Sequence, residues 1–218
     1  MLWIWWYIML NNSILNIYIW NIKQNKLALI FILTNAYRST FPVLHYNNTC
    51  MFQYCSPFIE RSLSTAAELA FTCQIINWLN ITGIRRIINI FSIIVAEICC
   101  WKGIITGLSY WHVLEESLWC FNAILLIIWL DSNSIKPDSI QKIIYKHKYK
   151  YIIKSVIYCY IFYMLIYDIP LYINRPNVVK GEILTCKHIT HDINVWYNNL
   201  VWMTGYFTLG SWASLLIS

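Results

Sequence analysis

Long apolar stretches separated by short polar segments run through the chain and predict a bundle of membrane-spanning helices. A spanning helix needs about 20 mainly apolar residues. Five stretches approach this length: Ser62–Leu79, Ile87–Leu108, His112–Leu130, Tyr149–Ile173 and Trp196–Ile217. Because lipid offers no hydrogen-bond partners to the backbone, a chain with this pattern is expected to be all-α.

The N-terminal region has a less regular pattern. Residues 1–22 are apolar from the first residue, but asparagines at positions 11, 12 and 16 interrupt them, and Leu27–Thr34 is too short to span alone. The latter stretch is expected to be re-entrant, interfacial or a continuation of the first. We therefore predict five or six spans, with an N-terminal membrane or interfacial segment and loop over 1–61 and a transmembrane bundle over 62–218.

The composition supports a membrane protein and gives no support to a nucleic-acid-binding one. Hydrophobic residues make up 59% of the 218 and charged residues only 12%, about half the charged share of a soluble domain. The net charge of +6 lies mainly in the loops, and basic and aromatic residues are not interleaved. We expect this charge to set the orientation in the membrane rather than to bind nucleic acid.

The basic residues fall mostly in loops on one side of the predicted bundle. Arg85 and Arg86 lie in one such loop, and Lys148 and Lys150 in another. The positive-inside rule places this side in the matrix if the membrane is the mitochondrial inner membrane. These four residues are candidates for binding an anionic phospholipid such as cardiolipin, and the alternative is that they only set topology.

Several ionisable residues lie inside the predicted spans: Glu68, Glu97, Glu115, Glu116, Asp168 and Lys102. An acid at the bilayer centre costs about 2.5–3.5 kcal/mol, so each is expected to face a partner in the bundle. For Glu68 the candidate cations are Arg61 and Lys102, and we expect its helix to contact those of Glu97 and Glu116. Interhelical polar contact is the favoured role, and a proton path is the alternative.

The loop cysteines and histidines predict a disulfide more than a metal site. Cys50, Cys55 and Cys186 fall on the side predicted to face the intermembrane space, which can oxidise thiols. Cys186, His188 and His191 are weak metal candidates, because their spacing does not match a recognised zinc site. No nucleotide, serine-hydrolase or calcium motif is present in the sequence, so we expect no catalytic residues and no cofactor apart from bound lipid.

Residue usage points to an organelle gene. Glycine occurs 6 times and proline 5 times, and the chain is rich in Ile, Asn and Tyr, as an AT-rich coding sequence would give. Tryptophan nevertheless occurs 12 times, although its standard codon contains two guanines. Reading TGA as tryptophan, as many mitochondria do, resolves this conflict. The alternative is a nuclear protein whose tryptophans form interfacial belts.

Four segments resemble blocks shared by uncharacterised multi-span membrane proteins of protists and algae. The segments are AYRSTFP (residues 36–42), ERSLSTAAELAFTCQ (60–74), HVLEESLW (112–119) and WMTGYF (202–207). The resemblance covers about 180 residues in the same order, and it departs at Glu60, where the family often has glycine. It implies a fold and no activity.

The residue usage, which indicates an AT-rich gene and includes many tryptophans, also resembles that of the "ymf" reading frames of ciliate mitochondrial genomes. That resemblance implies a multi-pass subunit of the inner membrane, partnered by lipids and by other subunits of a respiratory complex, with cytochrome c oxidase or its supercomplex favoured. The expected function is a non-catalytic structural or assembly subunit. The alternatives are a small proton- or solute-conducting subunit using Glu68, Glu97 and Glu116, and a membrane redox enzyme using the His and Cys loops.

Overall fold

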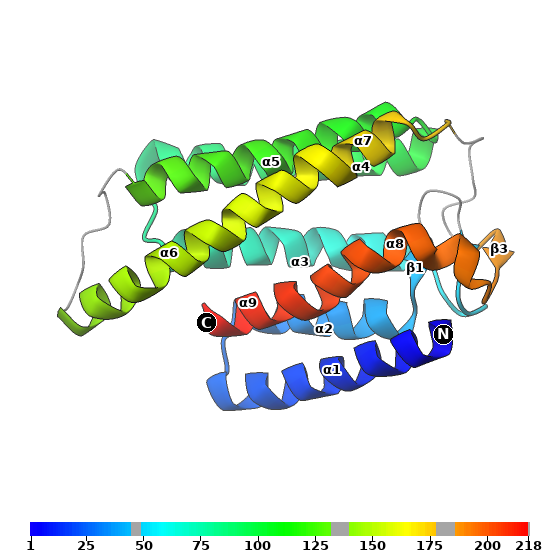
Figure 1. Cartoon of the computed structure of the whole chain (residues 1–218), viewed down its shortest axis with the longest axis horizontal. Helices are drawn as coiled ribbons and strands as arrows, with labels where there is room; N and C mark the ends of the chain where they lie inside the picture. Colours follow the sequence, from blue (N-terminus) through cyan, green and yellow to red (C-terminus); the bar gives the residue numbers. More distant parts are fainter. Residues whose placement is uncertain (45–48, 132–139, 178–185, 218) are drawn as a thin grey trace. The chain divides into compact units, whose positions relative to one another are not determined.

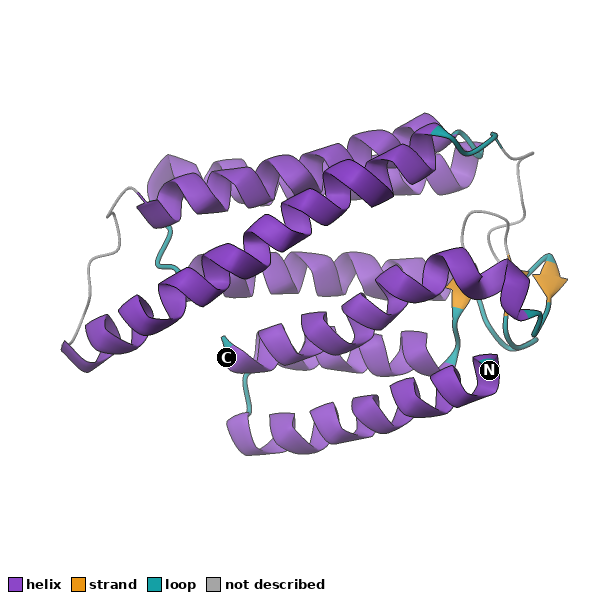
Figure 2. Ribbon diagram, in the orientation of Figure 1, coloured by secondary structure: helices purple, strands orange, loops and turns teal. Residues whose placement is uncertain are grey.

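The computed structural model describes residues 1–44, 49–131, 140–177 and 186–217, without the side chains of residues 131–150 and 152. These residues are mostly helical, as Figures 1 and 2 show. The chain divides into two compact units, which are described separately. Unit 1 is Met1–Ile75 with Val178–Ser218, and unit 2 is Ile76–Asn177.

Unit 1 joins the two ends of the chain. Its elements are α1 (Leu2–Lys23), α2 (Lys26–Thr40), β1 (Val43–Leu44), β2 (Thr49–Cys50), most of α3 (Pro57–Trp78), β3 (His188–Ile189), α8 (Ile193–Gly205), the π-helical segment η3 (Tyr206–Gly210) and α9 (Ser211–Leu216). Within the unit, α1 lies against α2, and both lie against α9. The first 75 residues fall in one unit with the C-terminal part of the chain, and the boundary expected at residue 61 stays a prediction.

A tight turn joins α1 to α2. Gln24 closes α1 in the left-handed conformation (φ 54°), and the side chain of Asn25 accepts hydrogen bonds from the backbone N–H groups of Leu27 and Ala28. This cap starts a new helix where the sequence suggested a short re-entrant or interfacial piece. The segment Leu27–Thr34 is therefore part of a 15-residue helix.

Two neighbouring polar residues of α1, Asn12 and Ser13, make contacts inside unit 1. Asn12 Nδ2 donates to the carbonyl of Phe207 across 2.9 Å, and Trp212 Nε1 donates to Asn12 Oδ1 across 3.1 Å. Ser13 shares a hydrogen bond of 2.8 Å with Ser39 of α2. Asn12 and Ser13 are therefore two positions at which this helix attaches to its neighbours.

A small three-stranded sheet, in the order β1-β2-β3, lies beside the helices of unit 1. β1 pairs with β2 antiparallel, and β2 pairs with β3 in parallel, so that Thr49 is opposite His188 and Cys50 is opposite Ile189. Each strand has two residues, which is too short to leave a pattern in the sequence.

Unit 2 is built on a helical hairpin. Its elements are the last turn of α3, α4 (Gly83–Thr106), α5 (Ser109–Asp131), α6 (Ile140–Tyr163), the π-helical segment η2 (Met164–Asp168) and α7 (Ile169–Ile173). Gly107 ends α4 in the left-handed conformation (φ 71°), which glycine adopts without strain, and α5 begins two residues later. The helices α4 and α5 lie side by side (Figure 1), and α5 also contacts α6 and α7.

Three helical segments in the described part of the chain are long and apolar enough to cross a membrane: Gly83–Thr106, Ser109–Leu130 and Ile153–Ile173. All three belong to unit 2 and match spans expected from the sequence. The stretches Ser62–Leu79 and Trp196–Ile217 also form helices, but they do not meet this criterion. The part of the prediction that stands is a mostly helical chain with three candidate spans.

Candidate functional site

Two buried ion pairs on neighbouring helices form a polar cluster in unit 1. Arg38 of α2 pairs with Glu60 of α3, and both side chains are almost completely buried. Arg61, the next residue along α3, donates from Nη2 to Glu68 Oε2 across 3.2 Å, again with both side chains buried. Two cations therefore balance two carboxylates, which removes most of the cost of placing these charges among apolar helices.

Tyr206 connects the two ion pairs. Its hydroxyl donates to Glu68 Oε1 across 3.3 Å, and its ring lies 4.5 Å from Arg38 Cζ. Trp202 and Phe207 also face the Arg38 guanidinium, at 5.6 and 5.8 Å. This aromatic surface is favourable for a buried cation, because ring faces attract a positive charge.

Tyr206 is the first residue of the π-helical segment η3. A π-helical turn contains an additional residue, so it shifts the side chains that follow it around the helix axis. Asn35 Nδ2 of α2 binds next to this segment, where it donates to the Tyr206 carbonyl across 3.2 Å and to Ser211 Oγ across 2.8 Å. The buried amide of Asn35 thus fixes the backbone of the residue whose ring lies over Arg38.

Three of the four sequence segments quoted in the sequence analysis contribute residues to this cluster. AYRSTFP contributes Arg38, ERSLSTAAELAFTCQ contributes Glu60, Arg61 and Glu68, and WMTGYF contributes Tyr206. Arg61, one of the two candidate cations, and Tyr206 are therefore both partners of Glu68. The expected contact of Glu68 with the helices of Glu97 and Glu116 stays a prediction, because those helices belong to unit 2.

A second connection inside unit 1 joins α3 to α9. Gln74 Nε2 donates to the Ser214 carbonyl across 2.5 Å, and the Ser214 hydroxyl donates to Gln74 Oε1 across 2.8 Å. All of these atoms are buried. The amide of Gln74 therefore fixes the position of the C-terminal helix by two hydrogen bonds.

The fourth segment, HVLEESLW, lies in unit 2 and contains a second polar cluster. His112 Nδ1 and Glu115 Oε2 are 2.9 Å apart, and the imidazole stacks on Tyr172 with ring centroids 5.1 Å apart. Glu97 is buried on α4 and Glu116 is half-buried on α5. Asp168 is buried in η2 and accepts a hydrogen bond from Tyr163 across 3.4 Å.

Lys102 lies on the exposed side of α4. Its Nζ is 4.5 Å from the centre of the Trp111 ring. A cation over an indole at this distance contributes a modest attraction. The contact is between α4 and α5, so this lysine takes part in the hairpin of unit 2.

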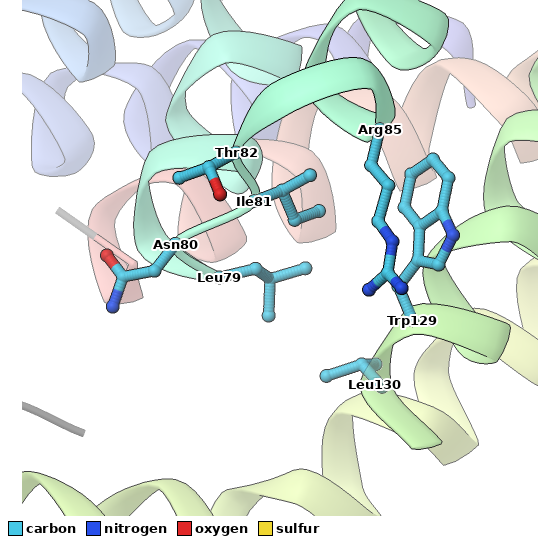
Figure 3. A pocket seen from close by; sticks show the side chains of 7 residues that line it. All are labelled: Leu79, Asn80, Ile81, Thr82, Arg85, Trp129 and Leu130. Carbon is cyan, nitrogen blue, oxygen red and sulfur yellow. The ribbon is translucent and has the colours of Figure 1, made fainter. Parts of the chain in front are cut away.

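Arg85 lines a cavity of about 220 Å³ at one end of unit 2. The other lining residues are Leu79, Asn80, Ile81, Thr82, Trp129 and Leu130. Figure 3 shows the Arg85 side chain extending beside the Trp129 indole. Arg86, its neighbour, is exposed, and the side chains of Lys148 and Lys150 lie outside the described residues.

The loop cysteines include one disulfide and one free thiol. Cys50 and Cys186 form a disulfide, with Cα atoms 5.8 Å apart, which joins β2 to the residue just before Lys187 and β3. Cys55 is a buried free thiol whose pKa is raised by burial. Because the Cys186 sulfur is part of the disulfide, it cannot act as a thiolate ligand together with His188 and His191. Both histidines are exposed.

Sequence reasoning missed Arg38, Glu60 and Tyr206 in unit 1 and Cys100 in unit 2. Cys100, His112 and Glu115 are all buried, and their ligand atoms lie within 4.8 Å of one another. The i, i+3 spacing of His112 and Glu115, close after a glycine turn, was the available signal for this cluster.

The chain matches no protein-family model, and comparisons with curated proteins and with solved structures also find no match.

Proposed function

We propose that this chain is a non-catalytic structural subunit of a respiratory complex in the mitochondrial inner membrane. The observation that supports this role most directly is the exposure of the span Ile153–Ile173, of which only 11% is buried within the chain itself. Its exposed side chains include Val156, Tyr158, Phe162 and Leu165. A helix that contacts so little of its own chain is suited to packing against a partner in the membrane.

The arrangement of the ionisable groups also favours a packing role over proton conduction. Arg38, Glu60, Arg61 and Glu68 are used in two ion pairs that hold α2, α3 and η3 together in unit 1. Charges that neutralise one another at close range stabilise an architecture, and they do not form a series of exchangeable proton sites. We therefore assign these groups to assembly of the unit.

The proposal includes five or six spans and not three. The helices α1 and α3 each have 22 residues, and the α8–η3–α9 segment covers 193–216. Each is about as long as the hydrocarbon core is thick. Their polar residues, such as Asn12 and Glu68, are engaged inside unit 1, which lowers the cost of placing these helices in lipid.

We further propose that the cavity at Arg85 binds the headgroup of an anionic phospholipid such as cardiolipin. A guanidinium matches a phosphate in geometry and charge, and Trp129 is of the residue type found at membrane interfaces. The cavity volume of about 220 Å³ is below the usual range for drug-sized ligands and suits a headgroup. Lipid bound here would contribute to the contact with neighbouring subunits.

Photocrosslinking from the exposed face of Ile153–Ile173 tests the packing role. A photoreactive residue in place of Phe162, which is 66% exposed, is expected to form an adduct with another protein subunit in intact membranes. The matched control is Met164, two residues further along the chain and 1% exposed, which should form no such adduct. Adducts with lipid alone at position 162 would contradict the proposal.

A further inference from the structure

The hairpin of α4 and α5 brings three residues with metal-ligating side chains together. Cys100 lies on α4, and His112 and Glu115 lie one turn apart on α5. The thiol sulfur, one ring nitrogen and one carboxylate oxygen all lie within 4.8 Å of one another, and the three residues are buried. This cluster belongs to unit 2 alone, and it is separate from the ion pairs of unit 1.

The tight connection between the two helices explains why these residues meet. In an antiparallel hairpin, residues at equal distances from the turn lie opposite each other. The turn is at Gly107 and Leu108, so Gly103 lies opposite His112 and Cys100 lies opposite Glu115. On each helix the two positions are three residues apart and therefore share one face.

Gly103 provides the space for the imidazole. A Cβ atom added to this glycine would lie 2.6 Å from His112 Nε2, which is closer than non-bonded atoms approach. The opposite face of the cluster is also occupied, because Tyr172 stacks on the ring and Glu115 Oε2 lies 2.9 Å from Nδ1. The ring is therefore held in one orientation between α4, α5 and α7.

The three donor types define the class of ion. Thiolate and imidazole together prefer zinc and related transition metals, whereas magnesium and calcium take oxygen ligands almost exclusively. Three protein ligands with a fourth position for water or another donor is a usual arrangement for zinc. Thiolate, imidazole and carboxylate ligands around a tetrahedral zinc ion lie about 3.4–3.6 Å apart, so small side-chain movements would complete the coordination.

We propose that Cys100, His112 and Glu115 bind one zinc ion. Such an ion would join α4 to α5 next to their connection and would compensate the charges of a thiolate and a carboxylate buried between helices. The inference is independent of the structural role proposed above, because it depends only on residues within the hairpin. A hydrogen-bonded cluster without any metal is the competing interpretation.

Zinc titration of the full-length chain in mild detergent tests the site, and the sequence supplies closely matched controls. After treatment with a chelator, the wild-type chain is expected to bind one Zn²⁺ in competition with a chromophoric chelator. Cys100→Ser and Glu115→Gln should each weaken binding by about 100-fold or more, because each removes a direct ligand and the loss of an outer-shell partner alone costs about 10–100-fold. Cys99→Ser and Glu116→Gln change the neighbouring residue of the same type and should leave affinity within about twofold of wild type, because neither residue belongs to the cluster.

Two further measurements keep the test decisive if a variant misfolds. Co²⁺ bound to the wild-type chain should give thiolate-to-metal charge-transfer absorption. Added Zn²⁺ should displace the Co²⁺ and remove this absorption. Gly103→Ala removes no ligand but should weaken Zn²⁺ binding by about 10–100-fold, because the new methyl group displaces the imidazole. Failure of folded wild-type protein to bind Zn²⁺ or Co²⁺ would overturn the proposal, and so would equal losses in Cys99→Ser and Cys100→Ser.

Discussion

The guanidinium of Arg61 donates to the carboxylate of Glu68 across 3.2 Å, although the two residues are seven positions, or about two turns, apart on the same helix. Most intrahelical ion pairs lie on a helix surface and contribute little. This pair is buried, and Tyr206 from the C-terminal part of the chain completes it. Its role is therefore to attach one segment of unit 1 to another.

Removing one partner of this pair is expected to destabilise unit 1 strongly. Glu68→Gln leaves the buried Arg61 without its carboxylate and should lower the unfolding free energy by about 3–5 kcal/mol. The measurement is thermal unfolding of the purified chain in detergent, followed by circular dichroism. The double variant Arg61→Gln/Glu68→Gln should lose less than the sum of the two single changes. Strict additivity would contradict a direct interaction between the two side chains.

Substitutions at Tyr206 separate its hydroxyl from its ring. Tyr206→Phe removes the hydrogen bond to Glu68 and keeps the ring over Arg38, so it should cost about 1–2 kcal/mol. Tyr206→Leu removes both and should cost about 1–2 kcal/mol more, because a buried cation loses its aromatic surface. The same unfolding measurement checks both variants. Equal losses in the two would show that the contact between ring and guanidinium contributes nothing.

The disulfide between Cys50 and Cys186 should stabilise the chain in oxidising conditions. The bond closes a loop of 136 residues and should contribute about 2–5 kcal/mol. Addition of a reductant, or the change Cys50→Ser, should lower the unfolding temperature. Cys55→Ser is the matched control, because this thiol is free and nearby. Thiol labelling that finds Cys50 and Cys186 reactive before reduction would contradict the bond.

The proposed phospholipid site can be tested on the two adjacent arginines. Arg85→Gln should reduce the amount of anionic phospholipid that remains bound after detergent extraction, because Arg85 lines the cavity. Loss of one guanidinium–phosphate contact should weaken lipid binding by about 1–3 kcal/mol. Arg86→Gln removes the same charge from an exposed neighbour outside the cavity and should have a much smaller effect. Equal losses would indicate that only the total positive charge matters. Lipid mass spectrometry of the purified variants provides the measurement.

The helical class and the three spans of unit 2 could be predicted because long apolar runs are a local property of the sequence. The expected spans Ile87–Leu108 and His112–Leu130 correspond to the observed helical segments Gly83–Thr106 and Ser109–Leu130. The predicted and observed spans differ only at their ends. The helix ends differ because caps and turns such as the one at Gly107 determine where a helix stops, and the apolar pattern does not show these positions.

The partners of the buried polar residues could not be predicted in the same way. Arg38 and Glu60 are 22 residues apart, and Tyr206 and Glu68 are 138 residues apart, so only the folded chain brings them together. Cys100 looked like one more small residue in an apolar helix. Its neighbours become evident only when α4 and α5 are aligned about Gly107.

The central claim is that this chain works as part of a larger membrane assembly. Extraction of native membranes with a mild detergent, followed by a native gel and mass spectrometry of the band that contains the chain, tests it most directly. We predict that the chain migrates in a high-mass band together with subunits of a respiratory complex. Migration as a single chain of 26.0 kDa with its detergent, free of any respiratory subunit, would contradict the proposal.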